Sequence, residues 1–102
     1  MALSPFSDAD LRALAERWGL AEIALFGSIL RDDFRPESDI DVLIRPKPGV
    51  VLTFGEFLDL EAELQRLAGR KVDLVDRTAV EESHNWLRRR AILESARTVY
   101  AA

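Results

Sequence analysis

Two short motifs in the first half of the chain have residue types and spacing suited to phosphate chemistry. Gly27-Ser28 is followed, after ten residues, by Asp39-Ile40-Asp41. A glycine and a serine after an apolar segment can present backbone amides and a hydroxyl to a phosphate group. Two aspartates separated by one residue project from the same face of a strand and repel each other unless a cation lies between them. The pattern indicates a divalent-cation site beside a phosphate-binding turn.

A third carboxylate extends this prediction. Asp73 lies in an expected strand over residues 71–76. Asp76 is the alternative, but a regular strand places it on the face opposite to Asp73, so Asp73 is preferred. A third acid beside a metal pair can hold a second ion or take a proton from an attacking hydroxyl, as in in-line phosphoryl transfer. We therefore expect Asp73 to meet Asp39 and Asp41.

The composition restricts the metal. The chain has no cysteine and a single histidine, His84. Disulfides, thiolate-bound zinc and a histidine-rich site are therefore excluded, and oxygen ligands favour magnesium, manganese or calcium. Magnesium keeps waters and substrate phosphates in its shell, which suits aspartates that open onto solvent. Arg31, three residues after Ser28, could contact a triphosphate oxygen or pair with Asp32 or Asp33.

Local patterns predict the elements that must position these residues. A capping-box pattern at Ser7 opens a helix that ends at Gly19, and another at Thr53 opens a helix that ends at Gly69. Strands are expected at residues 22–26, 39–45 and 71–76. A single helical turn through Arg31 is expected between the first two strands. A helix is expected from residue 78 to the end, with a break near residues 83–85.

This order of elements predicts the fold class. The chain has 102 residues and 48% apolar content, which is enough for one core and too little for two, so residues 1–102 are expected to form a single domain. The fold should be α+β (α/β-like), a small mixed sheet of three to four strands packed by helices. No apolar run approaches the roughly 20 residues that span a bilayer. With no export signal at the N-terminus either, a cytoplasmic protein without membrane contact is expected.

The charge distribution bears on the partners. The formal net charge is −4, so a nucleic-acid backbone would repel the chain unless its charges segregate. The run Arg88-Arg89-Arg90 is interpreted as the solvated face of a helix, and nucleic acid is not expected as a partner. Trp18 is expected in the core from its helical spacing, and Tyr100 at a frayed helix end. Both a monomer and a homo-oligomer remain open.

The spacing of these motifs resembles the signature of the minimal nucleotidyltransferase domain of the DNA polymerase β-like superfamily. The positions that match that signature are Gly27, Ser28, Arg31, Asp39, Asp41 and, on the later strand, Asp73. The resemblance implies transfer of a nucleoside monophosphate from a nucleoside triphosphate, with two magnesium ions or manganese. It also implies that Asp39 and Asp41 bind metal, that Asp73 binds metal or acts as a general base, and that Gly27-Ser28 holds phosphate.

One departure from the family pattern concerns the phosphate site. Asp32 stands where the family often has glycine, and Asp33 follows it. Extra negative charge close to a triphosphate weakens its binding unless these side chains turn outward. The departure therefore makes the predicted activity less secure than the predicted fold.

The small size of the chain bears on the acceptor. Short stand-alone members of the family are similar to antitoxins encoded beside HEPN-domain toxins, which implies that this chain binds such a toxin and attaches AMP from ATP to a hydroxyl of it (AMPylation). A binding module that neutralises its partner by occlusion is the alternative. An RNA-tailing nucleotidyltransferase and an aspartate-nucleophile phosphatase are less favoured, the latter because Leu43 stands where such a site usually has Thr or Val.

Overall fold

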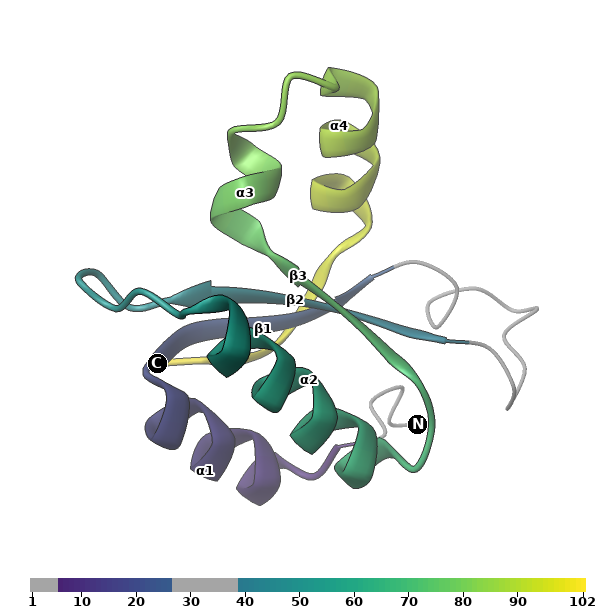
Figure 1. Cartoon of the computed structure of the whole chain (residues 1–102). Coiled ribbons are helices and arrows are strands. Elements are labelled where there is room, and N and C mark those ends of the chain that lie inside the picture. The colour runs from purple at the N-terminus through teal and green to yellow at the C-terminus, as the bar shows by residue number, and fades with distance from the viewer. Residues whose placement is uncertain (1–5, 27–38) are drawn as a thin grey trace.

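A four-stranded mixed sheet separates two helical layers in the computed structural model, which describes residues 6–26 and 39–102 (Figure 1). The strand order is β3-β2-β1-β4; β1 is antiparallel to both β2 and β4, and β3 is parallel to β2. The α+β prediction, with a small mixed sheet packed by helices, is confirmed. The elements are α1 (Asp8–Trp18), β1 (Leu20–Phe26), β2 (Ile40–Pro46), α2 (Phe54–Ala68), β3 (Val72–Asp76), α3 (Arg77–Glu81), α4 (Trp86–Ser95) and β4 (Arg97–Ala101).

The two long helices begin and end where the sequence pattern predicts. Ser7 caps α1, and Thr53 forms a reciprocal capping box with Glu56 at the start of α2. The Thr53 backbone N–H donates to the Glu56 carboxylate, and this bond holds the pKa of Glu56 below its ordinary value. Gly19 and Gly69 end the helices at φ of 69° and 72°, a left-handed conformation that glycine adopts without steric cost.

Strand β2 presents a different kind of surface to each helical layer. Ile40, Val42 and Ile44 are all 0% exposed and face the core beneath α1 and α2. Leu43 is buried on the opposite face, in a smaller cluster with residues of α3 and α4. Figure 1 shows the two pairs of helices on opposite sides of the sheet. Asp41 alternates with the apolar residues, so it lies on the α3 and α4 side.

The C-terminal segment departs from the prediction of a helix to the end of the chain. The break near residues 83–85 is confirmed, because α3 ends at Glu81 and α4 begins at Trp86. Residues 97–101, however, form the edge strand β4, and their helix prediction is wrong. Tyr100 pairs with Ile23 of β1 and packs against the core, so it does not lie at a frayed helix end. Pairing with β1 decides this conformation, in agreement with the β-branched and aromatic residues of the segment.

Helix α2 also covers the outer edge of β3. The Gln65 side chain accepts a hydrogen bond from the Val72 backbone N–H at 3.2 Å, and the Glu61 carboxylate accepts one from Leu74 at 3.3 Å. Backbone donors at a sheet edge need partners, and these two receive theirs from a helix. None of the described helices has the length and apolar character needed to cross a membrane.

A buried acid joins the two helices of the larger layer. Glu63 of α2 is 8% exposed, and its carboxylate forms an ion pair with Arg17 of α1. It also accepts a hydrogen bond from the Trp18 indole N–H at 3.4 Å, and Arg66 lies 3.9 Å away. Trp18 packs against the core as predicted. The buried charge is thus paired, which is the condition for burying it without a large desolvation cost.

We expect Leu64→Ala to lower the free energy of unfolding by about 2–5 kcal/mol. Leu64 is 0% exposed between α2 and the sheet, so the truncation leaves a cavity. Leu67→Ala on the same helix is the matched control; Leu67 is 38% exposed, and its truncation should cost less than about 1 kcal/mol. Urea denaturation of both variants measures the difference. Equal destabilisation would contradict the burial pattern of α2.

Candidate active site

Asp41 and Asp73 occupy paired positions on neighbouring strands. In the parallel pairing of β2 with β3, their Cα atoms are register partners. Adjacent strands lie about 4.8 Å apart, and paired residues present their side chains on one face. Asp41 is half-buried and Asp73 is exposed. The register therefore places two carboxylates side by side on the face that also carries α3 and α4.

Asp39 lies directly before β2, two positions from Asp41, and has a basic neighbour. Its Oδ2 atom is 3.8 Å from the Nζ atom of Lys71, and the Ile40 backbone N–H donates to the Lys71 carbonyl at 3.0 Å. The ammonium group offsets the repulsion among the carboxylates at this end of the sheet. Lys71 did not emerge from the sequence reasoning, although its spacing of two from Asp73 matches that of Asp39 from Asp41.

Asp76, the alternative third acid, has a structural task instead. It is the N-cap of α3, and its Oδ1 atom accepts a hydrogen bond from the Thr78 backbone N–H at 2.8 Å. Its register partner on β2 is Ile44, three positions along the strand from Asp41. The structure therefore groups Asp73, and not Asp76, with Asp41.

The predicted phosphate-binding residues Gly27, Ser28 and Arg31 lie outside the described residues. The strand that precedes them ends at Phe26, and the Cα partner of Phe26 is Asp41. Strand β1 therefore ends beside the carboxylate pair.

The donor set at this end of the sheet fits a hard divalent cation. Carboxylate oxygens are the ligands preferred by magnesium and manganese, and solvent access leaves room for waters and substrate phosphates. Over residues 6–26 and 39–102, no group of three or more acidic or histidine side chains is already gathered closely enough to hold a metal ion. The backbone register brings Asp41 and Asp73 together, and Asp39 faces Lys71.

Ion pairs hold α3 over the same face of the sheet. Arg77 at the start of α3 pairs with Glu22 of β1, and Arg45 of β2 lies 3.9 Å from Glu81 at the end of α3. Glu22 and Arg45 are register partners, so the contacts gather at the end of the sheet remote from the acids. These ion pairs attach α3 to the two central strands, on the face of the sheet that carries the carboxylates.

Comparisons with known proteins agree on one family. The model of the nucleotidyltransferase domain family matches residues 4–99. The protein adenylyltransferase MntA of Thermococcus cleftensis is 34% identical over 73 residues, which cover 72% of each chain. A solved structure described as a minimal nucleotidyltransferase superposes with a TM-score of 0.64 at 29% identity, covering 85% of this chain and 83% of the other. A toxin–antitoxin crystal structure with AMP-PNP shares the fold, with a TM-score of 0.68 at 21% identity over 90% of this chain and 71% of the other.

We expect Asp73→Asn to weaken Mn²⁺ binding by about tenfold or more, because it removes a charged oxygen donor beside Asp41. Asp76→Asn is the matched control: asparagine also caps a helix, so α3 should remain and Mn²⁺ binding should change less than about twofold. Titration of Mn²⁺ followed by electron paramagnetic resonance gives both affinities. A larger effect at position 76 than at position 73 would contradict the grouping.

Proposed function

We propose, because this chain belongs to the nucleotidyltransferase domain family, that it transfers AMP from ATP to a hydroxyl group of a partner protein. One observation carries the proposal: the β2–β3 register sets Asp41 beside Asp73, with Asp39 directly before β2. The family match over residues 4–99 and the likeness to a relative named as a protein adenylyltransferase support the reaction class.

In the proposed site, the residues identified from the sequence have separate metal-binding and phosphate-binding roles. Asp39 and Asp41, with Asp73 as a further ligand, would hold divalent cations, which when bound neutralise charge on the triphosphate. Gly27, Ser28 and Arg31 would hold the phosphates. Through the cations they would hold, the carboxylates would also position the α-phosphate for attack by an acceptor hydroxyl.

The bond changes of the transfer balance without any further reactant. The acceptor oxygen forms a bond to the α-phosphorus, while the bond from that phosphorus to the oxygen bridging to the β-phosphate breaks. Pyrophosphate leaves with the electron pair of the broken bond. In the alternative role of general base, Asp73 would accept the hydroxyl proton, because its carboxylate is exposed and can release the proton to water.

A protein acceptor, specifically a HEPN-domain toxin, is the proposed partner. The fold neighbours include a toxin–antitoxin complex and a HEPN toxin in complex with its antitoxin, described as tri-AMPylated. Trp86 and Leu87 at the start of α4 are 56% and 63% exposed, on the hairpin that stands on the same side of the sheet as the acids. Exposed apolar side chains that lie next to one another can form part of a protein contact site.

The test uses the chain, labelled ATP, Mg²⁺ and the protein encoded by the neighbouring gene. We expect label on the partner, and a loss of at least about a hundredfold in the labelling rate for Asp41→Asn, because charge on the triphosphate is then no longer neutralised. Asp59→Asn is the control, since Asp59 is an exposed acid on α2, on the other side of the sheet. Label that is absent with the wild type, or unchanged in Asp41→Asn, would refute the transferase proposal.

Neutralisation of the partner by occlusion is the second candidate, favoured by Asp32 and Asp33 beside the predicted phosphate site. The Asp41→Asn variant separates the two functions. If transfer is the function, the variant still elutes with its partner in gel filtration but no longer rescues growth of cells that express the toxin. Rescue by a variant that transfers no label would establish occlusion.

A further inference from the structure

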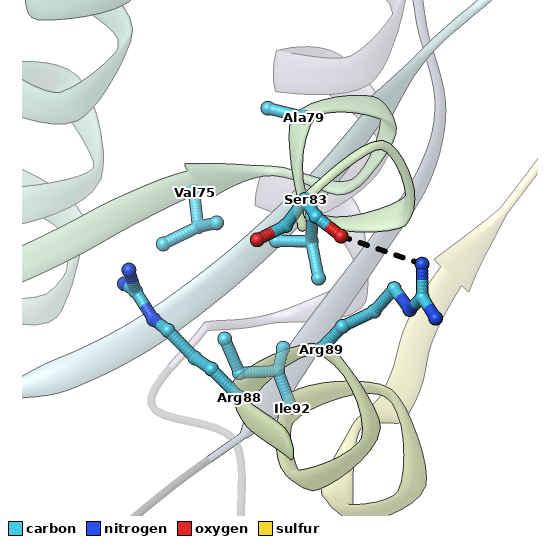
Figure 2. Close-up of a pocket in the computed structure, with 7 residues that line it drawn as sticks. Val75, Ala79, Ser83, Arg88, Arg89 and Ile92 are labelled. Carbon is cyan, nitrogen blue, oxygen red and sulfur yellow. Dashed lines mark hydrogen bonds between the residues drawn. The ribbon is translucent and has the colours of Figure 1, made fainter. Parts of the chain in front are cut away.

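The α3–α4 hairpin encloses a pocket that the proposed function does not yet use. Its volume is about 150 Å³, and it lies between the two helices and β3 (Figure 2). Apolar side chains form most of the wall, and two guanidinium groups complete it. The lining residues used below are Val75, Ala79, Ser83, Arg88, Arg89 and Ile92.

The two arginines of the pocket differ in their contacts. The Arg89 Nη1 atom donates to the backbone carbonyls of Glu81 and Ser83, both at 3.4 Å, which ties Arg89 to the turn of the hairpin. The Arg88 guanidinium makes no hydrogen bond or ion pair with the part of the chain that the structure describes, and it lies on the Val75 side of the pocket (Figure 2). Arg88 is thus available to a ligand.

The third arginine of the run, Arg90, lies outside the pocket and forms an ion pair within α4. Arg90 donates to Glu94 at 2.9 Å, one helical turn further along α4. Arg90 and Arg88 are both exposed, as predicted for the run, whereas Arg89 is half-buried; Arg88 and Arg89 also line the pocket, which the sequence did not predict.

The pocket is adjacent to the carboxylates. Val75 follows Asp73 by two positions on β3, and its register partner is Leu43, just as the partner of Asp73 is Asp41. Alternate residues of a strand share a face and are separated by roughly 7 Å. A ligand whose phosphates lie at the acids therefore needs only a short extension along the sheet to reach the pocket.

We infer that this pocket receives the base of the nucleoside triphosphate, with the Arg88 guanidinium stacked on the ring. The inference rests on the proposed transferase function and adds the residues that hold the nucleoside. A pocket of about 150 Å³ has room for a planar base but not for a whole nucleotide. Arginine stacks on the faces of nucleobases, and the apolar walls from Val75 and Ile92 suit a planar ring.

Calorimetry of Mg-ATP and of Mg-tripolyphosphate separates contacts to the base from contacts to phosphate. For Arg88→Ala we expect about tenfold weaker binding of Mg-ATP, with Mg-tripolyphosphate changed by less than about twofold. Arg90→Ala is the matched control: it removes the same charge from the same helix, outside the pocket, and should leave both affinities as in the wild type. Arg88 is exposed, so its truncation should not disturb folding.

A second variant tests the pocket by filling it. Ala79 is an exposed residue of the wall, and Ala79→Phe should weaken Mg-ATP binding while sparing Mg-tripolyphosphate. Equal losses of Mg-ATP affinity in Arg88→Ala and Arg90→Ala, or a parallel loss for Mg-tripolyphosphate in Arg88→Ala, would overturn the assignment of the base while leaving the transferase proposal intact. A wild type that binds neither ligand would overturn both.

Discussion

The burial of one face of β2 is the constraint on which the arrangement of the acids depends. Ile40, Val42 and Ile44 are completely buried, and each contributes about 1.5–3 kcal/mol relative to an exposed side chain. A shift of one residue in the pairing would turn all three toward the opposite face and bring Asp41 into the larger core. The apolar residues thus fix the direction of the carboxylate, and no contact made by the carboxylate itself is needed to do so.

Much of this arrangement could be predicted from the sequence because the signals are local. The capping residues Ser7 and Thr53 and the alternation along residues 40–44 define their own elements. The parallel pairing of Asp41 with Asp73 could not be predicted in this way, because it depends on how the α2 crossover between β2 and β3 packs. The sequence indicated that the acids meet, but not which positions of the two strands are paired. Strand β4 was missed because residues 97–101 follow a helix directly, and their pairing partner on β1 is about 75 residues earlier in the chain.

The arginine run shows why charge patterns alone did not predict the pocket. Successive residues of an α-helix point about 100° apart, so three adjacent arginines cannot share one environment. Their division between pocket and solvent depends on where α3 lies, and α3 is held by Arg77 and Glu22, which are 55 residues apart in sequence. The position of α3 therefore places three identical side chains in different surroundings.

The side chains of Gln65 and Glu61 that satisfy the β3 amides have a consequence for how another protein can approach. A peptide commonly binds a sheet by adding itself as a further strand, and it needs free backbone donors at the edge to do so. At β3 these donors are already occupied by α2. Addition of a strand at β3 therefore requires Gln65 and Glu61 to release these amides first, so the side chains of α2 protect this edge against main-chain pairing.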